Sequence, residues 1–434
     1  MSVALARRWL HAPARALLVV RSAFRRDAAM KAAPVIGMLV YAWATSAFVA
    51  SSVDGYGLTA SMRVISALPF VAPICAACSA WEVGRLRRGG IYDTTSCRSG
   101  LTVTARQIAP TLAIGVAALV ESAVIVWPEV ATGWMSPEPA ALAMGLAVLV
   151  GHVAFGVVWG RVLPAVVAVP GSLVVSYAWL VYPPALNIPW IRHLTGFNDS
   201  CCLNIYKLAP GAVLAPIVLA VSVTAAAFLV LSVRSRVLAF GAALAVFASC
   251  LALAVSLVSG LGFDPVQPRT GAMACAGSFP RVCVWPEHAR MLPEIAADAG
   301  QIAAVLSHYG LTVPQQATES IAPRPGPAWV FGIGLQDSPA QVRAQVAAGV
   351  APSGPPPCAQ HASWSAANSL MALQAWLLLR DGLSEATANN WVIPDAMAIV
   401  HRELAKPAAS QAAWFRQAMH AATTCAAHSG PGLP

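Results

Sequence analysis

Charged residues are scarce in this chain, and lysine is the rarest of them. Asp, Glu, Lys and Arg make up 10% of the 434 residues, whereas about 25% is usual in soluble proteins. The only lysines are Lys31, Lys207 and Lys406, and neither a Gly-x-x-x-x-Gly-Lys-Ser/Thr nor a His-Glu-x-x-His segment occurs. These absences exclude nucleotide hydrolysis at a P-loop and zincin-type catalysis by this chain. Any ATPase that works with it must therefore be a separate protein.

Long apolar runs take the place of the missing charge in residues 32–262. A helix needs roughly 20 apolar residues to cross about 30 Å of hydrocarbon. Seven runs meet this length, and the fifth contains Pro164, Pro170 and Gly171, which could kink or break it. The sequence predicts an all-α, polytopic bundle of about seven transmembrane helices. The predicted spans are Ala32–Val53, Thr59–Trp81, Ile108–Trp127, Pro139–Trp159, Val162–Tyr182, Ala209–Val233 and Val237–Leu261.

The basic residues between these runs predict an orientation in the cell membrane. Short cytoplasmic loops retain Lys and Arg. The N-terminal segment and the loops on its side hold fifteen basic side chains, and the opposite loops hold two, Arg192 and Lys207. We expect a cytoplasmic N-terminus and an extracytoplasmic C-terminus, although the loss of one span would reverse the latter. Because the basic residues flank apolar spans instead of forming one patch, no nucleic-acid partner is expected.

Residues 1–31 are expected to be a cytoplasmic amphipathic segment. Leu10, Ala14, Leu17 and Val20 recur at helical spacing, and arginines occupy mostly the other faces. Such a helix lies in the membrane interface with its arginines near anionic headgroups. The alternative is a frayed basic tail.

The composition changes in residues 263–434, which we interpret as an extracytoplasmic, mostly helical soluble domain. Pro and Gly concentrate in a linker after Asp264 and in the stretch Gly349–Pro357. Apolar residues recur every three to four positions in the later segments. Helical patterns cover about 287–309, 338–349, 361–380, 384–405 and 409–426.

Four of the ten cysteines lie in this last domain: Cys275, Cys283, Cys358 and Cys425. Oxidised pairs persist outside the cytoplasm, and four cysteines allow three pairings. Cys275 and Cys283 can close a short loop across a Gly and a Pro, which favours the pairs Cys275–Cys283 and Cys358–Cys425. The alternative is four free buried thiols.

Trp285-Pro-Glu-His288 follows the second of these cysteines and precedes a helical pattern. Pro286 suits a first helical position, and Glu287 suits the positive end of a helix. We interpret the segment as a helix cap. A ligand site that uses Glu287 and His288 is the alternative. Cys75-x-x-Cys78 has metal spacing but lies in an apolar run among alanines, where small residues let helices pack closely. No metal or other cofactor is expected.

Two polar residues lie inside predicted spans, Glu121 in the third and His152 in the fourth. Intramembrane acids are costly and often functional. Glu121 either has such a function or extends toward the outer interface, and His152 is expected to pack against another helix.

The predicted cytoplasmic loop after the second span resembles a known element. It reads Trp81-Glu-Val-Gly-Arg-Leu-Arg-Arg-Gly-Gly90 and continues through Arg98 to Arg106. With the amphipathic segment before it, the loop resembles the first cytoplasmic loop of ABC-2-type transporter permeases, over about residues 1–236. There a short coupling helix meets the ATPase. The resemblance implies a separate ATP-binding subunit, a homodimer, and ATPase contacts at Glu82, Arg85, Arg87, Arg88, Arg98 and Arg106.

Two functions therefore stand as hypotheses. The first is a permease-like subunit of an ABC-2-type transporter. The second is a membrane-anchored extracytoplasmic module that binds or senses a ligand without transport. The seventh span and the exterior domain depart from the permease pattern. Because no catalytic constellation is recognisable, no enzymatic activity is expected.

Overall fold

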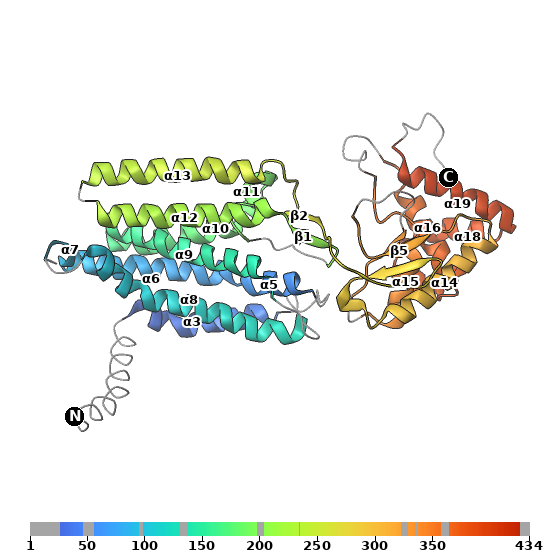
Figure 1. Cartoon of the computed structure of the whole chain (residues 1–434), viewed down its shortest axis with the longest axis horizontal. Coiled ribbons are helices and arrows are strands. Elements are labelled where there is room, and N and C mark those ends of the chain that lie inside the picture. The colour runs from blue at the N-terminus through green and yellow to red at the C-terminus, as the bar shows by residue number, and fades with distance from the viewer. Residues whose placement is uncertain are drawn as a thin grey trace, which may run out of the picture. The chain divides into compact units, whose positions relative to one another are not determined.

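The computed structural model divides the chain into two compact units, a membrane unit and a C-terminal unit (Figure 1). The membrane unit ends at Gln267, a few residues after the predicted boundary, and Asn204–Tyr206 belong with the C-terminal unit. The predicted amphipathic segment lies almost wholly outside the described residues. These are 27–46, 56–94, 99–130, 137–197, 204–233, 235–322, 329–334, 337–356 and 364–425.

The membrane unit is an all-α bundle, as predicted. Six of its described helical segments are long and apolar enough to cross a membrane, which marks the chain as a multi-pass membrane protein. The first segment joins two helices, α5 and α6, across a short turn. The helices are α5 (Gly57–Ile65), α6 (Leu68–Arg88), α8 (Gly100–Val130), α9 (Pro139–Val162), α10 (Ala165–Val181), α12 (Pro210–Ser232) and α13 (Arg236–Val258). Short helices α7 (Ile91–Thr94) and α11 (Pro189–Arg192) and a 3₁₀ turn (Pro183–Ala185) connect them.

The first predicted span is described only in part. It begins as helix α3 (Ala28–Ala44), whose 17 residues are the lower limit for a crossing. Residues 47–53, which complete the predicted span, lie outside the described part of the chain. A seventh crossing therefore stays a prediction.

The fifth predicted span is continuous despite its prolines. Pro164 is the N-cap of α10, and Pro170 lies inside the helix. Gly171 follows it against the Trp159 ring of α9, where a Cβ on residue 171 would come within 2.2 Å of a ring carbon. The glycine therefore lets the two helices pack closely, and the helix is not broken.

Small residues bring α6 and α9 together. Gly156 and Gly160 are four residues apart on α9, and Cβ atoms there would lie 2.0 and 2.4 Å from the carbonyl oxygens of Ala76 and Ala80 on α6. Helices in lipid associate through such close backbone approach, because there is no hydrophobic gain from leaving lipid. The Gly156–Gly160 and Ala76–Ala80 pairs form the centre of the bundle.

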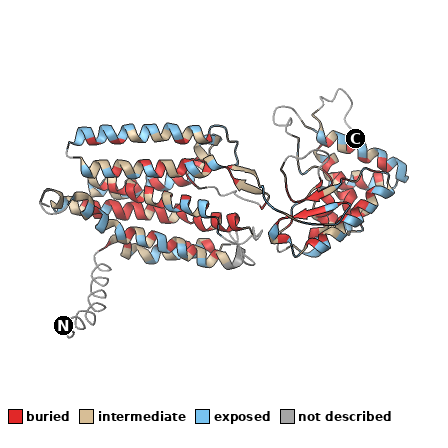
Figure 2. Ribbon diagram, viewed as in Figure 1, coloured by how far each residue is buried: buried red, intermediate tan, exposed pale blue. Residues whose placement is uncertain are grey.

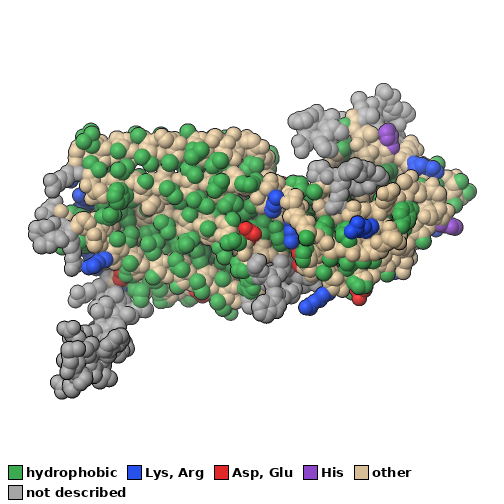
Figure 3. Space-filling model, in the orientation of Figure 1, with side chains coloured by type: hydrophobic (Ala, Val, Ile, Leu, Met, Phe, Trp, Pro, Cys, Tyr) green, Lys and Arg blue, Asp and Glu red, His purple; other side chains and the backbone are tan. Residues whose placement is uncertain are grey.

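Apolar side chains also cover the outer surface of the membrane unit. Val237 is 83% exposed and Leu244 69% on α13, and Val166 is 80% exposed on α10. Figure 2 shows α13 exposed along most of its length, and Figure 3 shows hydrophobic side chains spread over the visible face. An apolar surface of this extent requires lipid to cover it.

The C-terminal unit packs helices around a four-stranded sheet with the order β3-β4-β5-β6. β3 and β4 are antiparallel, and the remaining pairs are parallel. The strands are β3 (Ala274–Ala276), β4 (Arg281–Val284), β5 (Gln316–Thr318) and β6 (Trp329–Val330), and β1 (Tyr206–Leu208) pairs separately with β2 (Val266–Pro268). The helices are α14 (Leu292–His308), α15 (Pro339–Ala348), α16 (Ala367–Arg380), α17 (Glu385–Asn389), α18 (Pro394–Leu404) and α19 (Ala408–Thr423).

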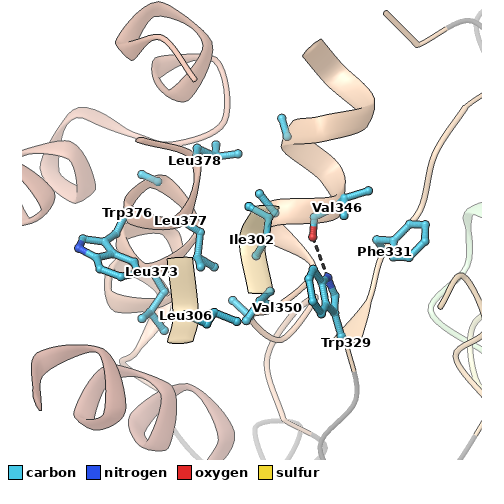
Figure 4. Packing of buried hydrophobic residues seen from close by; sticks show 14 of the residues in the cluster. Ile302, Leu306, Trp329, Phe331, Val346, Val350, Leu373, Trp376, Leu377 and Leu378 are labelled. Atoms are coloured by element: carbon cyan, nitrogen blue, oxygen red, sulfur yellow. Dashed lines mark hydrogen bonds between the residues drawn. The ribbon is translucent and has the colours of Figure 1, made fainter. Parts of the chain in front are cut away.

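This unit has its own hydrophobic core (Figure 4). Trp329 of β6 is fully buried and donates its indole N–H to the Val346 carbonyl of α15 over 2.8 Å. Trp376 of α16 is fully buried as well, and its indole N–H donates a hydrogen bond to the side-chain oxygen of Gln411 on α19. Large aromatic side chains with satisfied N–H groups give a single, well-ordered packing.

The mostly helical prediction for this unit is confirmed, with three differences. The sheet was not predicted. The pattern at 287–309 begins as a 3₁₀ turn (Pro286–His288) before α14 starts at Leu292. The pattern at 384–405 is two helices, because Pro394 occupies the first turn of α18 and ends the preceding segment.

Candidate functional site

One end of the membrane unit gathers the basic side chains. The N-terminal ends of α3, α8, α10 and α13 and the C-terminal ends of α6, α9 and α12 meet there, next to α7 (Figure 1). We call it the arginine end. Its described basic residues are Lys31, Arg85, Arg87, Arg88, Arg106, Arg161 and Arg236.

Glu82 lies at the centre of this end but is fully buried. Its carboxylate accepts the backbone N–H of Ala28 at 2.9 Å and the Gln107 amide at 2.8 Å. The Arg85 guanidinium lies 2.6 Å from Oε2, the same carboxylate oxygen that accepts the Gln107 amide. Glu82 therefore joins α3, α6 and α8, and any effect it has on a partner must pass through this junction.

The other arginines of the predicted contact differ in accessibility. Arg87 donates to the Arg161 carbonyl over 3.2 Å, which ties α6 to α9. Arg88 is exposed and lies over the Trp81 ring, and Arg106 is exposed on α8. Arg98 lies outside the described residues. A partner at this end would therefore meet Arg88 and Arg106 directly.

The short helix α7 is fixed between the spans by an aromatic contact. The guanidinium of Arg161 on α9 lies 4.6 Å from the centre of the Tyr92 ring. The Tyr92 hydroxyl forms a 2.8 Å hydrogen bond with Thr104 of α8. Burial raises the pKa of Tyr92, which keeps the hydroxyl protonated. The position of α7 thus depends on both α8 and α9.

The two intramembrane polar residues lie in different places. Glu121 is half-buried and faces α3, because a Cβ on Gly37 would lie 3.4 Å from its carboxylate. His152 packs against another helix, as predicted, through a 2.9 Å hydrogen bond between its Nδ1 and the Ser176 hydroxyl of α10. Cys75 and Cys78 are buried free cysteines of α6.

In the C-terminal unit, His288 belongs to a buried polar cluster. Its Nδ1 lies 2.6 Å from the Glu319 carboxylate, and both side chains are fully buried. The second oxygen of Glu319 accepts the backbone N–H of Trp285 at 2.7 Å. The Asn204 amide lies 3.4 Å from Glu319 and 3.5 Å from His288. The carboxylate thus joins the 3₁₀ turn to the segment after β5.

Glu287, predicted beside it, has a different partner. Its two oxygens lie 2.5 and 3.3 Å from the Arg269 guanidinium, which stacks 4.3 Å from the centre of the Trp285 ring. Glu287 and His288 therefore point to separate partners and do not converge. Among the described residues, no three His, Cys, Asp or Glu side chains form a group that could hold a metal.

The predicted disulfide Cys275–Cys283 is present. The two cysteines face each other in the register of β3 and β4, so the bond joins directly opposed residues of antiparallel strands. Cys425 is also disulfide-bonded. Its predicted partner Cys358 lies outside the described residues.

Comparisons with known proteins bear on the C-terminal unit alone. A family model described as "Domain of unknown function (DUF7224)" matches residues 282–425. The match begins in β4 and ends at Cys425, so it covers the core described above. No curated protein and no solved structure matches the chain.

Proposed function

We propose that this chain is a permease-like subunit of an ABC-2-type transporter, working as one of two copies with a separate ATP-binding protein. The main support for this proposal is the arrangement at the arginine end. There α7 is held between α8 and α9, and Arg88 and Arg106 are exposed. A partner that pushes on α7 would displace two spans together. This is the mechanical requirement for coupling.

Charge supports the same proposal. Asp27 and Glu82 are buried at the arginine end, so the charged side chains described there as exposed, Lys31, Arg88, Arg106 and Arg236, are all positive. A positive surface is complementary to an acidic cleft and guides the encounter and orientation of a partner.

The test is a double charge reversal, Arg88→Glu with Arg106→Glu. It avoids Arg85, whose replacement would leave the buried Glu82 carboxylate without its cation. The matched control is Arg236→Glu, an exposed arginine of the same end on α13, away from α7. After chemical cross-linking in native membranes, the wild type and the control should purify with an ATP-binding protein and the double variant without it. A wild-type chain that purifies without any ATP-binding protein overturns the proposal.

We further propose that the arginine end is cytoplasmic and that the C-terminal unit lies outside the cell membrane. The basic loops and the disulfides support this orientation. A reporter that is active only in the cytoplasm should stay silent when it is fused to the C-terminus. Cytoplasmic activity of the fusion would require an even number of crossings.

The second candidate is a membrane-anchored extracytoplasmic module without transport. It is favoured by the separate core of the C-terminal unit and by the family match to that unit alone. This candidate predicts no ATP-binding partner. Cross-linking should instead join residues 282–425 to an extracytoplasmic protein or ligand.

A further inference from the structure

A cavity of about 220 Å³ lies in the membrane unit among α9, α10, α12 and α13. Its walls are mostly apolar. They include Phe155 of α9, Trp179 of α10, Val223 of α12 and Leu251 of α13. None of these residues belongs to the arginine end or to the polar cluster of the C-terminal unit.

Two of the polar residues that line the cavity, His152 and Ser176, are hydrogen-bonded to each other. His152 lies about 20 Å from the start of α9 and about 15 Å from its end, at the rise of a regular helix. It is therefore near the middle of the span. Ser176 engages only Nδ1, and within the described part of the chain the imidazole has no second hydrogen bond. A polar group at this depth is costly unless it has a partner.

A buried turn closes one end of the cavity. Leu194 and Thr195 line it and are almost completely buried. The preceding His193 is held by a 2.8 Å hydrogen bond between Nε2 and the Gly262 carbonyl. Gly196 has φ +73°, and a Cβ there would lie 2.8 Å from a methyl group of Val148. Only glycine permits this turn to enter the bundle so deeply.

The side of the cavity reaches the outer surface of the bundle. Val175 of α10 is 43% exposed and Phe247 of α13 is 36% exposed, and both line the cavity. Their neighbours Val174 and Leu244 are 59% and 69% exposed, on the apolar surface that lipid must cover. A hydrophobic molecule can therefore enter from the bilayer without crossing water.

We propose that this cavity binds a neutral amphiphile, a single apolar chain that ends in a hydroxyl or carbonyl group bonded to His152. Apolar walls disfavour a charged head, because an unpaired charge there would lose its hydration. The imidazole supplies the one polar contact that such a head requires. An engineered cavity of about 150 Å³ holds benzene, so this one holds a chain segment and its head but not a whole phospholipid. The site does not depend on the transport proposal.

The test uses the full chain in lipid nanodiscs with a photoreactive, diazirine-bearing hexadecanol as the probe. The label should map to cavity residues of α9, α10 and α12. Excess hexadecanol should remove this label roughly fivefold more effectively than hexadecane, as expected for one hydrogen bond. Equal labelling of every lipid-facing helix, or equal competition by the two compounds, overturns the proposal.

Two neighbouring valines of α10 provide a matched pair of variants. Val175→Trp fills the cavity from its lipid side and should remove most of the cavity label. Val174→Trp makes the same change on the outward face and should leave the label unchanged. Both side chains are partly exposed, so neither change disturbs the core. Label that survives in folded Val175→Trp contradicts binding in the cavity.

The role of His152 has its own test. His152→Leu should still take up the probe but lose the preference for hexadecanol over hexadecane, and His152→Gln should restore the preference by offering an amide. If the preference survives in His152→Leu, the polar head does not bind this imidazole. If the valine and histidine variants all lose the label and also change oligomeric state, a second copy of the chain covers the cavity. That outcome would overturn the proposal of a lipid-derived ligand.

Discussion

Glu319 is predicted to stabilise the C-terminal unit through the hydrogen bonds of its buried carboxylate. Its buried carboxylate accepts the Trp285 N–H and lies 2.6 Å from His288. Replacing Glu319 with Ala leaves both of these groups buried without an acceptor. Nothing on the surface can replace the lost partner, because the residues involved are almost fully enclosed.

The size of the effect follows from the two orphaned groups. Each buried group left without a hydrogen bond costs about 1–3 kcal/mol, and the substitution leaves two such groups. We therefore expect Glu319→Ala to lower the free energy of unfolding by about 4 kcal/mol. For a domain of this size, this corresponds to roughly 8–16 °C in melting temperature.

Glu319→Gln should be milder, at about 1–2 kcal/mol. The amide oxygen can still accept the Trp285 N–H, and the amide N–H can donate to His288 Nδ1 if the imidazole proton moves to Nε2. Because Nε2 is buried and has no partner within the described residues, that proton then lacks an acceptor. The residual cost comes from this one group.

Thermal unfolding of the full chain, followed by protease resistance of the C-terminal unit, measures these differences. Glu294→Ala is the matched control, because Glu294 is an exposed carboxylate of the same unit. It should change stability by less than about 0.5 kcal/mol. A Glu319→Ala variant that melts with the control would refute the reasoning, as would a Gln variant that is less stable than Ala.

Three further predictions are also tested by thermal unfolding of the full chain, with protease resistance followed in the unit that carries each substitution. Gly160→Val should destabilise the bundle by about 1–3 kcal/mol, because residue 160 abuts the α6 backbone, whereas Gly241→Val, which meets nothing within 4 Å, should be close to neutral. Burial raises the pKa of Asp381, so the stability it contributes is full below pH about 4 and is lost as pH rises through the raised pKa. Asp381→Asn should flatten that part of the stability-versus-pH curve, and an unchanged curve would contradict the assignment. Cys275→Ser should cost about 2.5 kcal/mol, the loop entropy of a nine-residue closure, and an unchanged melting temperature under oxidising conditions would argue against it.

Much of the architecture could be predicted from the sequence. The apolar runs predicted the long helices, because lipid offers no partner for backbone N–H and C=O groups and forces each segment to satisfy them internally. The disulfide could also be predicted, because Cys275 and Cys283 are close in the chain and can close a short loop. The strands of the C-terminal unit could not, because runs of two to four residues are too short to show an alternating pattern.

The polar contacts were decided by tertiary structure alone. Glu82 was predicted to meet a partner, yet it is buried and accepts the N–H of Ala28, 54 residues away. His288 was assigned to a helix cap, with a ligand site shared with Glu287 as the alternative, yet its partner is Glu319, 31 residues away. A sequence pattern relates residues that are close together in a helix or strand. It therefore contains no information about pairs that are this far apart in the chain.

The sequence by itself therefore determined the local preference of each segment. A segment enters lipid, forms a helix or closes a short disulfide according to its own residues. Where α9, α10, α12 and α13 leave a cavity, and which buried acid meets which donor, depends on how helices distant in the chain come together. The physical reason is one of range. Backbone hydrogen bonding and hydrophobic transfer act residue by residue, whereas a buried polar contact and an empty volume exist only after several segments have packed.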